Sequence, residues 1–234
     1  MVAPRQLFED FLALFYPRLC LACGQHPPTG DDLTCTVCQY QLPQTNFHLE
    51  RENGFTEHFW GRLPLQAGAA RYYFTKKSKT QQLIHQLKYG GQARVGLQVG
   101  RQYGRELRDA PHFRGIDLIV PVPLHPRKQK MRGYNQSDSF ARGLSESLQR
   151  PWQAHALQRV SPSPSQTQKT RIERFENVRR AFRVPRPANL RGKHLLLVDD
   201  VLTTGATLEA CALQILAIPG TTVSMATIAM AQQS

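Results

Sequence analysis

The chain of 234 residues carries 30 lysines and arginines against 17 aspartates and glutamates, a net charge of +13, and 41% of its residues are hydrophobic. This length suits one medium-sized domain with a small appendage, and the apolar share excludes a wholly disordered chain. The longest apolar stretch near the N-terminus, residues 11–21, contains Pro17 and Arg18 and falls far short of the roughly 20 uninterrupted apolar residues that span a bilayer. Because Glu9 and Asp10 precede it where a signal peptide would be basic, we expect a cytoplasmic protein without membrane insertion.

The N-terminal part predicts a short amphipathic helix at residues 7–15, followed by a four-cysteine motif. The motif has the spacing C-x2-C, eleven residues, C-x2-C, and consists of Cys20, Cys23, Cys35 and Cys38. Two such knuckles can offer four thiolates to one tetrahedral Zn²⁺, and so small a segment has too little apolar area to fold without a metal. Two disulfides or a redox pair are the alternatives, and neither suits a ribbon-like segment of a cytoplasmic protein. We expect a structural zinc ribbon within a first unit, residues 1–65, which ends in a linker.

The second unit, residues 66–234, alternates apolar runs with amphipathic stretches. Strands are predicted at residues 69–74, 116–122, 154–160, 195–198 and 223–230. Helices are predicted at residues 80–87, 93–107, 137–148 and 206–217. Mostly apolar strands separated by helices are typical of a parallel sheet covered on both faces. The predicted fold class is therefore α/β, with a doubly wound parallel sheet.

The most informative segment is residues 195–207, where a buried strand leads to Asp199 and Asp200 and then into a loop that opens a helix. Ligands of open α/β sheets bind beyond the carboxyl ends of the strands. Backbone N–H groups at a helix N-terminus favour a phosphate, and Gly205 lets the backbone approach it. The carboxylates suit sugar hydroxyls, with Mg²⁺ assisting. A phosphorylated ribose therefore suits both the acidic pair and the phosphate-binding loop. The alternative is an ordinary strand-end turn with a helix cap. The predicted substrate-binding residues of this loop are Val201, Leu202, Thr203, Thr204, Gly205, Ala206 and Thr207.

Two basic segments suit a polyanion. Residues 125–135 contain four basic and no acidic side chains, and the candidate pyrophosphate ligands among them are Arg127, Lys128 and Arg132, with Tyr134 or Asn135 either supporting the loop or touching the ligand. Residues 159–193 contain ten basic side chains against two glutamates, with Arg171 a further candidate. Lys88, before a glycine pair, either reaches the site or belongs to a helix C-cap. A solvated basic face is the alternative for both segments.

Residues 196–207 resemble the signature of type I phosphoribosyltransferases, which consists of apolar residues, an acidic pair and a Thr/Gly loop. Together with the cysteine motif and the segments at residues 87–90, 121–126, 132–136 and 176–179, nearly the whole chain resembles the ComF family, whose members are associated with DNA uptake in competent bacteria. The resemblance implies that Asp199 and Asp200 bind the ribose hydroxyls of 5-phosphoribosyl 1-pyrophosphate (PRPP) and that the following loop binds its 5-phosphate. It also implies that residues 161–182 form a loop that closes over the site.

Two classes of function remain open from the sequence. One is a Mg²⁺-dependent enzyme that transfers the phosphoribosyl group to an unknown nitrogen acceptor, with Asp199, Asp200 and Arg132 as its catalytic residues. The other is a non-catalytic adaptor of the DNA uptake machinery that senses PRPP or binds single-stranded DNA. The residues identify neither a general base nor an oligomeric state.

Overall fold

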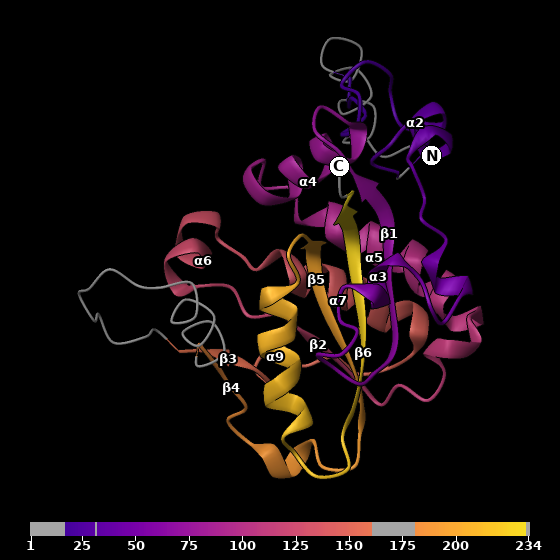
Figure 1. Cartoon of the computed structure of the whole chain (residues 1–234). Coiled ribbons are helices and arrows are strands. Elements are labelled where there is room, and N and C mark those ends of the chain that lie inside the picture. Colours follow the sequence, from indigo (N-terminus) through magenta and orange to yellow (C-terminus); the bar gives the residue numbers. More distant parts are fainter. Residues whose placement is uncertain (1–16, 31, 161–180, 233–234) are drawn as a thin grey trace, which may run out of the picture.

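The structure is a computed structural model that describes residues 17–30, 32–160 and 181–232 (Figure 1). Its centre is a four-stranded sheet with the order β1-β6-β5-β2, and all three pairings are parallel. These strands are β1 (Leu65–Phe74), β2 (Leu118–Pro121), β5 (His194–Leu202) and β6 (Thr222–Ala231). Beside β2, Trp152 forms a parallel bridge with Ile119, which extends the sheet by a short segment.

Helices cover both faces of this sheet, as the alternation of apolar runs and amphipathic stretches predicts. The longer helices are α4 (Lys79–Tyr89), α5 (Ala93–Asp109), α6 (Pro126–Arg132), α7 (Gln136–Leu148) and α9 (Ala206–Leu216). Figure 1 shows α9 on one side of the sheet and α5 and α7 on the other. Along β5, Leu195 and Leu197 enter the core cluster beneath α9, whereas Leu196 and Val198 enter the cluster beneath α5 and α7. The doubly wound α/β fold is thereby confirmed.

The shorter elements lie at the edges of this core. They are α2 (Thr36–Gln41), α3 (Gly54–Glu57), the 3₁₀ helices at Phe47–Leu49, Pro111–Phe113 and Pro187–Asn189, and the antiparallel pair β3 (Gln158–Arg159) and β4 (Phe182–Arg183). Phe55 and Phe59, from the segment before β1, are fully buried in the cluster beneath α9. The Asn53 side chain donates to the Gly68 carbonyl oxygen at 3.0 Å. Residues before 66 therefore contribute to the α/β core.

Glycines set how closely α5 and α7 approach each other. A Cβ added to Gly100 would lie 2.9 Å from the Cα of Gly143, and one added to Gly143 would lie 2.9 Å from the Cα of Gly100. Real Cβ atoms essentially never come that close to backbone, so only glycine fits at both positions. This contact fixes the position of α7 and of its first turn, which lies at the candidate site.

Three elements differ from the sequence-based expectations. The strand predicted at residues 154–160 is reduced to β3, because residues 154–157 form turns and only two residues find a partner, in β4. β5 runs on through the acidic pair to Leu202, because its pairing with β6 continues to Met230. The basic segment after β2, predicted as a loop, contains α6. The predicted helix at residues 7–15 lies outside the described residues.

The cysteine segment docks onto α5. The Leu33 N–H donates to Gln98 Oε1 at 3.0 Å, and Gln98 Nε2 donates in turn to Asp32 Oδ1. Within residues 17–30, 32–160 and 181–232, no helix is both long enough and apolar enough to cross a bilayer.

Candidate functional site

The acidic pair lies at the carboxyl end of β5, where it meets the end of α4 and the start of α7. Lys88 Nζ forms an ion pair with Asp200 Oδ1 at 2.9 Å, so Lys88 reaches the acidic pair. Gln136 Nε2 donates to Asp200 Oδ2 at 2.6 Å, and Ser137 Oγ donates to Asp199 Oδ1 at 2.9 Å. Three elements far apart in the sequence thus converge on two adjacent carboxylates, as expected at the carboxyl edge of a parallel sheet.

The two carboxylates are not equivalent. Asp200 is buried and both of its oxygens have partners, whereas Asp199 is half-buried and its Oδ1 also accepts from the Asp200 N–H at 2.8 Å. Asp199 Oδ2 accepts no hydrogen bond from the part of the chain that the structure describes. Burial, followed by the neighbouring Asp200 charge, raises the pKa of Asp199 from 3.8 to about 7. Asp199 therefore offers one open oxygen to a ligand.

The loop after β5 and the N-terminus of α9 line the same small hollow as Asp199. Gly205, the residue before α9, has a φ of 76°, which favours glycine, and no side chain caps the helix. Thr203 and Thr204 are exposed, and a small hollow of about 50 Å³ is lined by Asp199 and residues 201–208. Uncapped backbone N–H groups at a helix N-terminus suit an anion such as a phosphate.

Residues before β1 support this loop from beneath. A Cβ on Gly205 would lie 3.0 Å from the Phe59 ring. Arg62 packs its guanidinium 5.7 Å from the centre of that ring and forms an ion pair of 2.7 Å with Glu209 in the first turn of α9. Phe59 and Arg62 fall in the segment expected to be a linker, and no local pattern indicates that they meet α9.

The basic segment after β2 divides into two parts. Arg127 and Lys128 are exposed on α6, and neither forms an ion pair with any described residue. Arg132 lies 5.1 Å above the Tyr89 ring, and its buried Nε finds no hydrogen-bond acceptor within the described ranges. Tyr134 donates its hydroxyl to the Leu87 carbonyl oxygen, so it ties the segment to the end of α4. Arg171 lies outside the described residues.

The first turn of α7 contains two site residues without a role assigned from the sequence, Gln136 and Ser137. Asn135 caps the helix by accepting from the Ser137 N–H at 3.3 Å, and it donates to the Val122 carbonyl oxygen at 3.1 Å. This cap aims Gln136 and Ser137 at the acidic pair. Gln136 Oε1 is buried, and no described group donates to it. The sequence did contain one signal for Gln136 and Ser137. They stand at the start of a predicted helix, and that helix was expected to begin at the same edge of the sheet as the acidic pair.

The four cysteines form a second cluster. Their sulfurs all lie within 4.8 Å of one another, all four thiols are free, and Cys23 Sγ lies 4.0 Å from Cys35 Sγ. A disulfide needs about 2.05 Å, whereas four sulfurs at about 2.3 Å from one zinc would be about 3.8 Å apart. Hydrogen bonds from the backbone N–H groups of Gln25 and His26 lower the pKa of Cys23 to about 6. The donor set therefore fits a tetrahedral thiolate metal and not a disulfide pair.

Comparison with known proteins agrees with this arrangement. The model of the phosphoribosyl transferase domain family matches residues 136–233. DNA utilization protein YhgH of Escherichia coli (strain K12) is 32% identical over 205 residues, which cover 86% of this chain and 85% of the relative. Competence protein F of Haemophilus influenzae is 33% identical over 131 residues, 54% of this chain and 57% of the relative.

Among solved structures, glutamine PRPP amidotransferase from B. subtilis complexed with ADP and GMP superposes with a TM-score of 0.43 and 18% identity. The superposition covers 62% of this chain and 30% of that chain. The matched family domain contains β5, the acidic pair, α9 and β6, together with α7. The fold expected from the sequence, a parallel sheet of the type I phosphoribosyltransferase kind behind a four-cysteine segment, is confirmed.

Proposed function

Because the chain belongs to the family of DNA utilization protein YhgH and competence protein F, we propose that it acts in DNA uptake and binds PRPP with Mg²⁺ at the carboxyl end of β5. One observation carries this proposal. Asp199, which has an open Oδ2, lines the same small hollow as the uncapped N-terminus of α9, so an acceptor for sugar hydroxyls and donors for a phosphate share one site.

The proposed reaction is transfer of the phosphoribosyl group to a nitrogen nucleophile, with release of pyrophosphate. Asp199 and Asp200 would accept hydrogen bonds from the ribose hydroxyls, and residues 203–207 would hold the 5-phosphate. Arg132, with its unsatisfied Nε, is the basic side chain best placed for the pyrophosphate, and Mg²⁺ would neutralise charge on the departing group. Most of the catalysis would come from positioning and electrostatics.

The carboxylates fit such a ligand, although Lys88 already neutralises Asp200 in the free protein. A hydroxyl or a hydrated Mg²⁺ would meet the open oxygen of Asp199 first. The cysteine cluster would hold one structural zinc through Cys20, Cys23, Cys35 and Cys38, and this metal would take no part in the transfer.

Calorimetry with PRPP in Mg²⁺ buffer tests the binding site. The double change Asp199→Asn and Asp200→Asn should weaken binding by about two orders of magnitude, because each charge-assisted hydrogen bond contributes about 1.5–3 kcal/mol. Gly205→Val should weaken it at least as much, since the added side chain meets the Phe59 ring and strains a positive φ. Asp109→Asn removes an exposed carboxylate at the end of α5 and serves as the matched control.

Wild-type affinity in both folded site variants would place the ligand elsewhere. Incubation with PRPP, Mg²⁺ and a mixture of free bases, read by mass spectrometry, separates the two classes of function. A ribosylated product with pyrophosphate release supports the enzyme, and saturable binding without turnover supports the adaptor.

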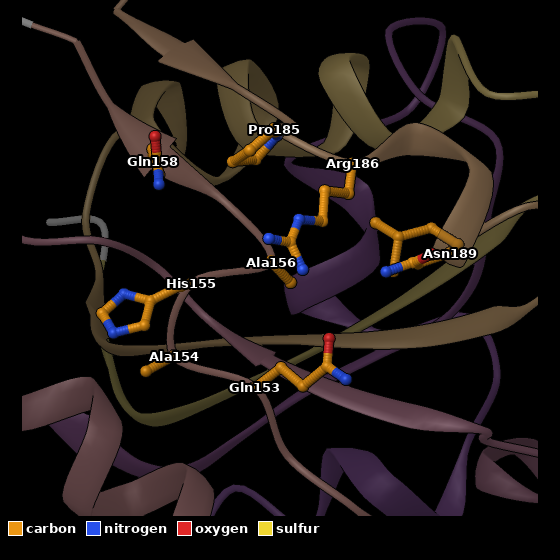
Figure 2. A pocket seen from close by; sticks show the side chains of 9 residues that line it. Gln153, Ala154, His155, Ala156, Gln158, Pro185, Arg186 and Asn189 are labelled. Atoms are coloured by element: carbon orange, nitrogen blue, oxygen red, sulfur yellow. The ribbon is translucent and has the colours of Figure 1, made fainter.

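A second candidate function, binding of single-stranded DNA, is favoured by the hollow shown in Figure 2. The hollow has a volume of about 540 Å³, and none of the residues that line it is an aspartate or a glutamate. They are Gln153, Ala154, His155, Ala156, Gln158, Pro185, Arg186, Asn189 and Leu190. Figure 2 shows the Arg186 guanidinium extending into this hollow, with His155 at its rim. A concave surface with a guanidinium and no carboxylate suits a phosphate backbone.

Fluorescence anisotropy of a labelled oligonucleotide at increasing salt tests this second function. Binding through phosphates should weaken steeply between low and physiological salt and show little sequence preference. Arg186→Gln should reduce the slope of log affinity against log salt by about one. Salt-insensitive or strongly sequence-specific binding would contradict the assignment.

A further inference from the structure

A separate hollow of about 400 Å³ lies on the side of α7 that faces away from the acidic pair. The start of α5, Gln129 of α6, the first two turns of α7 and Trp152 line it. On α7, Gln136 and Ser137 face the acidic pair, whereas Asp138 and Arg142 lie on the opposite side at helical spacing and face this hollow. Its volume lies within the range of small-molecule sites.

Two aromatic side chains give the hollow its apolar surface. Trp152 and Tyr134 both line it and are both partly exposed. The Tyr134 hydroxyl already donates to the Leu87 carbonyl oxygen, so the ring itself remains for a ligand. Aromatic rings at a partly open hollow suit a flat heterocycle that stacks on them.

One carboxylate in the hollow has an open oxygen. Asp138 Oδ1 accepts from Asn135 Nδ2 at 2.7 Å as part of the cap of α7, whereas Oδ2 accepts nothing from the residues the structure describes. Burial raises the pKa of Asp138 to about 6, against the effect of the Asn135 hydrogen bond and the His155 charge. The cap explains one oxygen only, and the other suits an N–H donor on a ligand.

Positive charge lies at the rim of the same hollow. Arg94 is exposed and forms no ion pair with any described residue, whereas Arg142, exposed on α7, forms an ion pair of 3.3 Å with Glu146. Guanidinium groups are well matched to phosphate. The hollow therefore combines a stacking surface, an acceptor for an N–H group and donors for an anion.

We propose that this hollow binds a purine nucleotide that carries an amino group. The base lies against Trp152, its amino group donates to Asp138 Oδ2, and its phosphate meets Arg94. This site is distinct from the proposed phosphoribosyl site, and it does not depend on that proposal.

Trp152 supplies the readout. The chain has two tryptophans, so Trp60→Phe leaves Trp152 as the only one. In the Trp60→Phe variant, AMP should quench the Trp152 emission in a saturable way. Purine riboside 5′-monophosphate, which is AMP without its amino group, should bind about tenfold more weakly, because the hydrogen bond to a charged acceptor is lost.

Two variants test the assigned contacts in the same background. Asp138→Asn keeps the acceptor for Asn135 but removes the charge, and it should weaken AMP binding about tenfold. Arg94→Gln changes an exposed side chain, so it should leave the fold intact and weaken AMP binding while leaving adenosine binding unchanged.

Asp199→Asn separates this site from the phosphoribosyl site, because it should weaken PRPP binding and leave quenching by AMP unchanged. The proposal fails if AMP gives no saturable quenching, if quenching is lost with Asp199→Asn, or if Asp138→Asn and Arg94→Gln both bind AMP like the parent.

Discussion

Asp199→Asn is expected to stabilise the free protein above neutral pH. Burial and the Asp200 charge raise the pKa of Asp199 from 3.8 to about 7, so the ionised carboxylate opposes folding. Its cost is absent below the unfolded-state pKa and complete above the folded-state pKa, which places the change between about pH 4 and about pH 7. About three pKa units correspond to an upper limit of roughly 4 kcal/mol, and we expect about half of this because Asp199 is only partly buried.

The asparagine keeps an oxygen that can accept from Ser137 Oγ and the Asp200 N–H, so the hydrogen bonds of the strand end are preserved. Urea unfolding followed by circular dichroism, at about pH 5 and about pH 8.5, measures the free energy of unfolding of variant and wild type. The difference between them should grow by about 1 kcal/mol from the lower to the higher pH, because part of the change already lies below pH 5. An equal difference at both pH values would refute the account of Asp199 as a buried, repelled carboxylate.

The remaining predictions concern contacts around the site and the cysteine cluster. Lys88→Gln should lower the free energy of unfolding by about 3 kcal/mol, because it leaves the buried Asp200 charge without its cation, and a denaturation midpoint equal to that of wild type would contradict this. Gly143→Ala should destabilise the protein by roughly 1–3 kcal/mol in thermal unfolding, since its Cβ would collide with the backbone of α5. Protein purified without chelator should contain one zinc per chain by metal analysis, and finding no thiolate-bound metal would remove the zinc assignment. Cys20→Ser should unfold the cysteine segment while most of the α/β core persists, as seen by circular dichroism.

Local sequence patterns predicted most of the fold. The apolar runs at residues 195–198 and 223–230 predicted the central strands because both faces of β5 and β6 are buried, which leaves no polar alternation. α6 was missed because its seven residues bury no side chain, so they show no apolar periodicity. Its end signals, Pro126 at the start and Gly133 with a φ of 79° after the end, were present in the sequence.

The candidate site was predicted in part. Asp199, Asp200 and Gly205 could be placed at a strand end because a strand, an acidic pair and a helix start follow one another directly. The partners Gln136 and Ser137 could not, because they come from an element more than sixty residues away in the sequence. These contacts depend on how α7 packs against the sheet, and the local sequence does not indicate that packing.

The pairing of β1 with β6 constrains how the protein can fold during synthesis. Leu65 of β1 lies opposite Val223 of β6, and β6 is the last strand of the sheet in the order of the sequence. At a translation rate of about 5–20 residues per second, roughly 10–30 s separate the synthesis of these two strands. Throughout that interval the pairing edge of β1 has no native partner, and its apolar residues Ala67, Ala69 and Ala70 are open to chaperones on the ribosome or to other nascent chains.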